Sequence, residues 1–329
     1  MIQNLLIQSH HLLISFFLVT SVALGQGAFG ETRHQKAEYN LSSAELSISP
    51  YIIGTLLMPE SVDRPNLVII IPGSGPTDRN GNQPMMNNNA LKFLAQGLQE
   101  QGIASFRYDK RIIPLVKQGN FQEENVSFDD FIVDAREVLN YFINTNAFNK
   151  IFIAGHSQGS LVGMIAAKDG ADGFISIAGA GQSIDQVVLD QLALQLPSAV
   201  PEAEAAFNTL RNTGQVEDYP AALGTIFRPS IQRFMAQWMS YDPGAILSSL
   251  DLPKLILNGT SDLQVFEQEA LLLKKAAPSA QFKVIVNMNH VLKIIKEKGL
   301  ANGKSYNDPN LPVSEELIST MALFINQNS

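Results

Sequence analysis

The stretch IFIAGHSQGSLVG, residues 151–163, combines an apolar strand, a sharp turn and the start of a helix. Its centre, GHSQG at 155–159, fits the pattern G-x-S-x-G, in which a serine is exposed on a strained turn between a strand and a helix. The two glycines relieve crowding in such a turn. The first amides of the helix, beginning with Gln158, are expected to point at the place where an oxyanion would form. Ser157 is therefore the candidate nucleophile.

A serine nucleophile needs a base, and His290 is the candidate. The chain has five histidines. Two lie in an apolar N-terminal segment, a third follows it, and His156 adjoins Ser157 and is expected to point away from it. A lone histidine in a loop is more often a surface residue than a base. His290, however, follows a strand predicted at 282–286, downstream of Ser157, where this arrangement places its base.

Asp262 is the candidate acid, which would hold the tautomer of His290 and stabilise its protonated ring. The strand predicted at 253–257 runs into the turn NGTSD at 258–262, and the resulting order Ser, Asp, His suits the pattern. Three other carboxylates compete for this role: Asp251, Glu267 and Glu269. The first precedes its strand, at the wrong edge of the sheet, and the two glutamates are expected on the helix that follows.

The turn PGSGP, residues 72–76, follows an aliphatic run at 67–71. It is expected to complete an oxyanion hole beside the amide of Gln158, with the N–H of Ser74 as the second donor and that of Gly75 as the alternative. A plain tight turn would also explain the glycines. A phosphate-binding loop does not fit, because the pattern G-x-x-x-x-G-K-[ST] and a nearby lysine are missing.

Strands alternate with helical stretches from residue 37 onwards, which predicts an α/β fold with a mostly parallel central sheet flanked by helices. Strands are expected at 44–48, 52–57, 67–71, 103–108, 151–154, 173–177, 253–257 and 282–286, the first two as an antiparallel pair. Helices are expected at 90–101, 128–144, from Gln158 and at 313–326. Between 184 and 240 only helical patterns and prolines occur, so this segment is expected to be a helical lid insertion over the C-terminal edge of the sheet. The core would then comprise 37–183 and 241–329.

The composition of the chain excludes several kinds of binding partner and several kinds of site. The chain has 329 residues, 45% of them hydrophobic and 16% charged, with a net charge of −8 and no basic cluster. Nucleic acid is therefore not an expected partner, because binding phosphates needs a concentrated positive face. The absence of cysteine removes a thiolate nucleophile, disulfides and cysteine-ligated metals. We expect no cofactor and no metal, while the oligomeric state is left open.

The apolar run LLISFFLVTSVAL, residues 12–24, has the length of a signal-peptide core and is too short for a membrane span. Residues 1–25 are expected to be a signal peptide cleaved before Gln26, with cleavage after Gly30 as the second choice. The expected product is an exported bacterial protein, periplasmic or secreted, without a stable membrane anchor. No lysine or arginine precedes the run, so an uncleaved N-terminal anchor is the alternative.

Taken together, these motifs resemble exported α/β-hydrolases related to the S33-like serine aminopeptidases and to bacterial esterases. The matching pieces are PGSGPTDRNGN (72–82), FRYDKR (106–111), GHSQGS (155–160), WMSYDP (238–243), LNGTSDLQV (257–265) and MNH (288–290). The resemblance implies the α/β-hydrolase fold with a lid, no metal, and ester hydrolysis. In the family, Asp-Lys-Arg is followed by a glycine-rich turn, whereas here residues 109–111 continue with Ile-Ile-Pro, which puts the shape of the neighbouring loop in question.

The chemistry expected of this site is two-step acyl transfer on a small-molecule ester. The lid is rich in apolar residues and ends near Trp238, which favours an apolar acyl pocket and therefore carboxylic esters, although ordinary packing would give the same composition. An aminopeptidase would need an acidic pocket, which four lid residues could supply: Glu202, Glu204, Glu217 and Asp218. An acyl thioesterase and a non-catalytic binding protein are further alternatives.

Charged residues also gather in two of the matching motifs. They are Asp78, Arg79, Asp109 and Arg111. We expect them to form an ion-pair network beside the site, either bracing loops or contacting substrate.

Overall fold

The computed structural model describes residues 43–60, 62–296 and 299–329. The expected signal peptide and both of its cleavage positions lie outside these residues, so export stays a prediction. None of the helices in the described ranges is long and apolar enough to cross a membrane.

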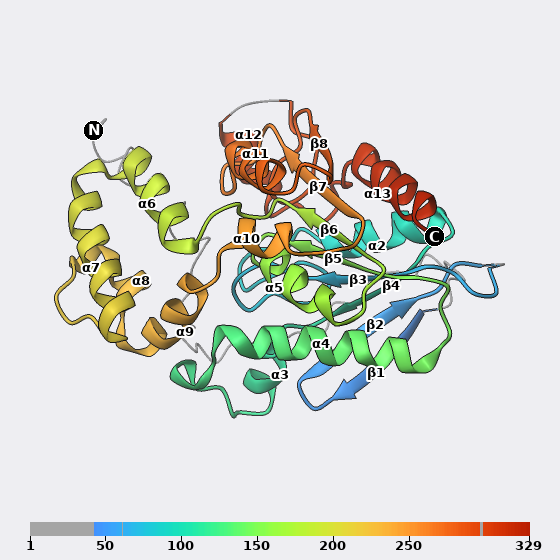
Figure 1. Ribbon diagram of the computed structural model, residues 1–329, viewed down its shortest axis with the longest axis horizontal. Coiled ribbons are helices and arrows are strands. Elements are labelled where there is room, and N and C mark those ends of the chain that lie inside the picture. Colours follow the sequence, from blue (N-terminus) through green and yellow to red (C-terminus); the bar gives the residue numbers. More distant parts are fainter. Residues whose placement is uncertain (1–42, 61, 297–298) are drawn as a thin grey trace.

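Eight strands form one sheet in the order β1-β2-β4-β3-β5-β6-β7-β8 (Figure 1). Their bounds are Ser43–Ser49 (β1), Ile52–Leu57 (β2), Leu67–Ile71 (β3), Ala104–Tyr108 (β4), Ile151–His156 (β5), Gly173–Ile177 (β6), Lys254–Gly259 (β7) and Gln281–Ile285 (β8). β1 pairs antiparallel with β2, and β2 antiparallel with β4, whereas all other neighbours are parallel. The predicted antiparallel start and mostly parallel sheet are confirmed.

Helices cover both faces of this sheet (Figure 1). The α-helices of the described residues are Ala90–Glu100 (α2), Ile112–Lys117 (α3), Phe128–Thr145 (α4), Gln158–Ala166 (α5), Ile184–Gln195 (α6), Val200–Thr213 (α7), Gly224–Phe227 (α8), Pro229–Met239 (α9), Pro243–Ser248 (α10), Glu267–Ala276 (α11), Leu300–Ser305 (α12) and Glu315–Gln327 (α13). The sequence did not predict α3, α10 or α12. In α3, Pro114 lies in the first turn, where its missing N–H removes no helical hydrogen bond.

Each face of the sheet packs in its own apolar core, and alternate residues of β3 contribute to the two cores. Leu67, Ile69 and Ile71 pack in the core that includes residues of α4 and α5, whereas Val68 and Ile70 pack in the core that includes residues of α2 and α13. Each such buried aliphatic side chain stabilises the fold by about 1.5–3 kcal/mol. A continuous aliphatic run is therefore what a central strand covered on both faces requires.

The segment between β6 and α10 contains helices and no strand among its residues, all of which are described, as the sequence predicted. Helices α6 to α9 extend to one side of the sheet, at the left of Figure 1. α9 rests on α4 through aromatic pairs: the rings of Phe128 and Trp238 stack 5.6 Å apart, and Phe131 meets Phe234 edge-on at 5.8 Å. This anchors the end of the segment to the body of the protein.

Candidate active site

Ser157 stands on a strained turn between β5 and α5. Its backbone angles are φ 55° and ψ −123°, which few L-residues adopt. The turn is tight: a Cβ atom on Gly155 would lie 2.1 Å from the carbonyl oxygen of Gly159, and one on Gly159 would lie 2.4 Å from that of Ile71. The predicted need for glycine at both positions is confirmed. Such a turn holds the serine in place at the carboxyl end of the strand.

His290 and Asp262 form a buried pair. Nδ1 of His290 lies 2.8 Å from Oδ2 of Asp262. The other oxygen of Asp262 accepts hydrogen bonds from the backbone amides of Gln264 (2.8 Å) and Val265 (2.9 Å), which fix the carboxylate. Each of the two side chains thus has one orientation, with the second ring nitrogen of His290 left for another partner.

The three competing carboxylates do not take this place. Glu269, in the first turn of α11, instead accepts hydrogen bonds from the amide of Gly181 (2.8 Å) and the side chain of Gln182 (2.9 Å). Asp251 precedes β7, and Glu267 begins α11, as expected.

Ser157 and His290 line the same cavity, which measures about 40 Å³ and also borders Gly73 and Ser74. A second cavity of about 20 Å³ borders Ser157 together with Gln158, Ile184 of α6 and Trp238 of α9. The structure thus brings together all the residues that the sequence selected for nucleophile, base and oxyanion hole. Each cavity holds only a few water molecules, so a substrate must widen one of them to enter.

The side chain of His156 lines the cavity of Ser157 and contacts His290, so the expectation that it points away from the nucleophile was wrong. Its Nε2 lies 2.8 Å from the carbonyl oxygen of His290, and the two rings are 4.8 Å apart. Burial, followed by the neighbouring His290, lowers the pKa of His156 to about 3, so the ring is neutral and donates through Nε2. The only sequence signal was its position next to Ser157.

Lys110 is a second residue that the sequence did not select. Its Nζ donates to the carbonyl oxygen of Gly73 (2.8 Å) and to the side-chain oxygen of Gln158, and it lies 4.1 Å from the ring centre of Phe131. Lys110 has no carboxylate partner among the described residues. Burial lowers its pKa to about 7. The amino group of Lys110 ties together the two segments that carry the expected oxyanion donors.

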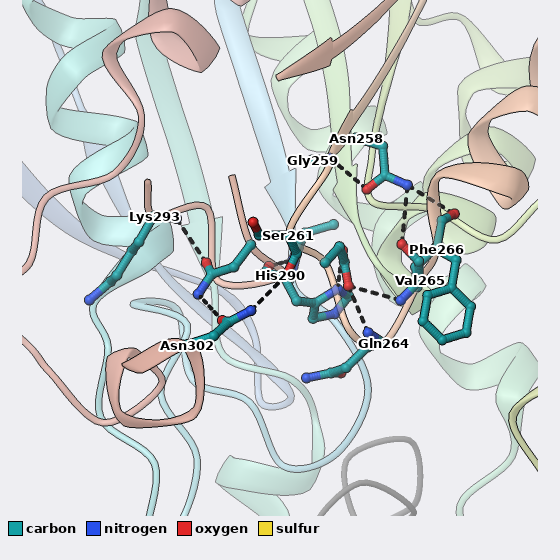
Figure 2. Close-up of polar contacts among 12 residues, drawn as sticks. Asn258, Gly259, Ser261, Gln264, Val265, Phe266, His290, Lys293 and Asn302 are labelled. Atoms are coloured by element: carbon teal, nitrogen blue, oxygen red, sulfur yellow. Dashed lines mark hydrogen bonds and ion pairs between the residues drawn. The ribbon is translucent and has the colours of Figure 1, made fainter. Parts of the chain in front are cut away.

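A buried polar network supports the loop of His290 (Figure 2). Nδ2 of Asn289 donates to Asn302 (2.9 Å) and to Ser305 (2.7 Å) of α12. Nδ2 of Asn302 donates to the carbonyl oxygen of Ser261 at 2.8 Å, next to Asp262. A single helix thus holds the loop of the base and the loop of the acid against each other.

The four charged residues expected to form one network belong to different groups. Arg79 pairs with Asp109 through two nitrogens (3.0 and 2.9 Å). Arg111 pairs instead with Asp134 of α4 (2.6 Å). Asp78 accepts the backbone amides of its own loop, so the single ion-pair network is not formed.

The glycine-rich turn after β3 is held by Gln83. Its Nε2 donates to the carbonyl oxygen of Ser74 and to Thr77 Oγ1, both at 2.8 Å. Gly75 adopts φ +79°, where a side chain would be strained, and it faces Gln83. Gln83 and Gly75 thus fix the shape of the turn that carries Ser74.

Comparison with known proteins agrees with this architecture. The model of the family described as "Serine aminopeptidase, S33" matches residues 88–297, well over half of the chain. Among curated proteins, "Esterase EstD" of Thermotoga maritima is 27% identical over 245 residues. That alignment covers 73% of this chain but only 57% of the relative, so the chain spans little more than half of the relative's length.

Solved structures are similar in fold. Est1E from Butyrivibrio proteoclasticus superposes with a TM-score of 0.53 at 15% identity, covering 86% of this chain and 99% of that one. The alpha/beta hydrolase GrgF from Penicillium sp. sh18 gives 0.51 at 14% identity, covering 88% and 98%. The predicted α/β-hydrolase fold is confirmed.

Proposed function

Because the chain belongs to the serine aminopeptidase S33 family, we propose that it is a serine hydrolase that cleaves carboxylic esters through an acyl-enzyme on Ser157. One observation carries the proposal: the buried Asp262–His290 pair opens onto the cavity that Ser157 and the turn after β3 also border. The order of the three residues along the chain, Ser, Asp, His, is that of the α/β-hydrolases. The 27% identity to an esterase supports a carboxylic ester as the bond that is cleaved.

In the first step, Nε2 of His290 takes the proton of Ser157 as Oγ attacks the ester carbonyl carbon. Asp262 stabilises the imidazolium that forms. The negative oxygen of the tetrahedral intermediate is held by the amides of Gln158 and Ser74. His290 then protonates the leaving alcohol, and the acyl group stays on Ser157.

In the second step, water replaces the alcohol. His290 takes a proton from the water molecule, whose oxygen attacks the acyl carbon and forms a second oxyanion in the same hole. Collapse of this intermediate releases the carboxylic acid and returns the proton to Ser157. The enzyme needs no cofactor for either step.

The acyl chain is proposed to enter the cavity beneath α6 and α9. Its lining is mainly apolar, with Ile184 and Trp238 contributed by the helical segment. We therefore propose that this segment acts as the lid, and that its movement on α4 widens the cavity for the substrate.

An ester fits the site better than an aminoacyl amide. No carboxylate is among the described residues that line either cavity at Ser157, so nothing there would bind a substrate ammonium. The four acidic residues considered for that purpose are Glu202, Glu204, Glu217 and Asp218. All four are exposed to solvent and border neither cavity.

Covalent labelling tests the nucleophile. A fluorophosphonate probe should label the wild-type chain and leave Ser157→Ala unlabelled, while circular dichroism shows both folded. Equal labelling of the two proteins, or none, would refute the acyl-enzyme proposal. The bond is tested with p-nitrophenyl esters against aminoacyl anilides, where turnover of anilides alone would establish the aminopeptidase instead.

A further inference from the structure

Besides the two small cavities at Ser157, a larger cleft lies on the other side of the turn after β3. It has a volume of about 790 Å³ and is bordered by polar residues of this turn, β2, β4, α2 and α3. Gln83 borders both this cleft and the small cavity of Ser157. Along the turn, Thr77 faces the cavity and the next residue, Asp78, faces the cleft.

The cleft is positively charged in a chain that is negative overall. Four cations border it: Arg79, Lys92, Arg107 and Lys117. Two carboxylates, Asp78 and Asp109, also border it, which leaves a net charge of +2 against −8 for the whole chain. Among the described residues, only one of these cations, Arg79, forms an ion pair, with Asp109 inside the cleft and with exposed Glu45.

Arg107 is the unusual member of this group. It lies on β4 and is only 7% exposed, yet it forms no ion pair with any described residue. Its one hydrogen bond among them is a long one, from Nε to Asn80 (3.4 Å). Its Nη1 is enclosed and has no acceptor among the described residues. Burial and the nearby Arg79 lower its pKa to about 10.

A buried guanidinium without a carboxylate is costly, because burial removes hydration and no opposite charge replaces it. Asp78 and Asp109 attract this charge, but neither forms an ion pair with Arg107. Asp78 turns one oxygen to the amides of Asn80 and Asn82 (2.8 and 2.9 Å) and pairs with no cation of the described chain. The side chains of Lys92 and Lys117 likewise form no hydrogen bond or ion pair within the described residues, and so remain available to a ligand.

We infer that this cleft is a binding site for an oxyanion, a carboxylate or a phosphate, held by Arg107 at its base and by Lys92 and Lys117 at its rim. The planar guanidinium suits two oxygens of one such group. Because Gln83 and the turn after β3 separate the cleft from the cavity of Ser157, an anion bound there lies against the segment that carries Ser74.

Calorimetry on the full chain tests the site without reference to catalysis. Inorganic phosphate and succinate, each titrated at low ionic strength, should bind saturably to the wild type and equally to Ser157→Ala. Arg107→Gln and Lys92→Gln should each raise the dissociation constant about 10-fold or more, the loss of one charge-assisted contact. Lys275→Gln, which removes the same charge from the exposed face of α11, should leave binding unchanged.

The outcomes separate clearly. Absence of saturable binding of both anions, or binding that Arg107→Gln and Lys92→Gln leave intact, would overturn the inference. Lys92 is only half-buried on α2, so its variant stays informative even if Arg107→Gln fails to fold.

A pair of esters identifies the source of the anion. If the anion belongs to the substrate, Lys92→Gln should raise KM for the mono-p-nitrophenyl ester of succinic acid and not for p-nitrophenyl butyrate. If the anion is a separate ligand, added phosphate should change the rates on both esters alike in the wild type and not in Lys92→Gln. Either result supports the site.

Discussion

The Nε2 atom of His156 lies 2.8 Å from the carbonyl oxygen of His290, so the residue before the nucleophile holds the backbone of the base. The two rings are 4.8 Å apart. The turn between β5 and α5 and the loop after β8 are thereby joined by a hydrogen bond, and residues of both line the same cavity.

Replacing His156 should affect turnover more than substrate binding. In His156→Leu the bulk stays but the bond to His290 is lost, and we expect kcat to fall about 10- to 100-fold through displacement of the base. His156→Gln keeps an N–H that can reach the same oxygen and should recover part of the rate. If His156→Leu and the wild type had equal kcat on p-nitrophenyl esters, His156 would not position the base.

His156 should also make the protein sensitive to acid. Its pKa falls from 6.5 to about 3 on folding, so between these values the unfolded chain binds more protons than the folded one. The free energy of unfolding should therefore decrease as the pH drops from 6.5 towards 3. Urea unfolding at several pH values should show a weaker dependence in His156→Gln, and an identical slope in both proteins would be evidence against the buried neutral ring.

Asp262→Asn should leave the fold intact and remove the activity. The side-chain oxygen of asparagine can still accept the amides of Gln264 and Val265, which places its NH₂ group against Nδ1 of His290. The ring is then forced to carry its proton on Nε2 and cannot accept one from Ser157. We expect kcat to fall about 10⁴-fold, the size found for the same change in a serine protease triad, with an unchanged circular dichroism spectrum. Near-normal kcat would exclude Asp262 as the acid.

Lys110→Met should change both the rate and the pH dependence of stability. Loss of the bonds to Gly73 and Gln158 loosens the oxyanion segments, and we expect kcat to fall about 10-fold or more. Because the pKa of Lys110 is about 7 in the folded protein against 10.5 unfolded, its contribution to the free energy of unfolding rises between these pH values. Urea unfolding should show a smaller rise in the methionine variant. The difference between the two proteins isolates this lysine from other groups.

Asn302→Ala should weaken the link between the acid and base loops. The change leaves the carbonyl of Ser261 without its donor, and Asn289 loses one of its two acceptors. We expect the free energy of unfolding to fall by about 1–3 kcal/mol and kcat to fall with it. Asn208→Ala on the exposed face of α7 is the matched control and should change neither quantity. A stability loss without any change in kcat would show that the network serves folding alone.

The strands of the sheet could be predicted from the sequence for a physical reason. Central strands such as Leu67–Ile71 and Gly173–Ile177 are buried on both faces, so they must be apolar throughout and their ends are easily recognised. Short helices leave no comparable pattern: α10 and α12 each have six residues, too few for a clear helical period.

The candidate triad could be selected because its members follow strands at one edge of the sheet. Lys110, His156 and Arg107 could not be interpreted in the same way. In FRYDKR, Arg107 and Lys110 look like ordinary surface charges, and only tertiary packing, such as that of Lys110 on Phe131, buries them. The direction of the His156 side chain depends on the His290 loop, which lies more than a hundred residues away.

Trp238 gives this protein an optical property of its own. It is the single tryptophan of the chain, it is 5% exposed and stacked on Phe128, and it borders the small cavity of Ser157. All indole fluorescence therefore comes from one place, at the contact between α9 and α4. Filling of that cavity, or displacement of α9, changes the surroundings of this one ring. Stopped-flow emission can then follow substrate entry and acylation with natural, colourless esters and without any attached dye.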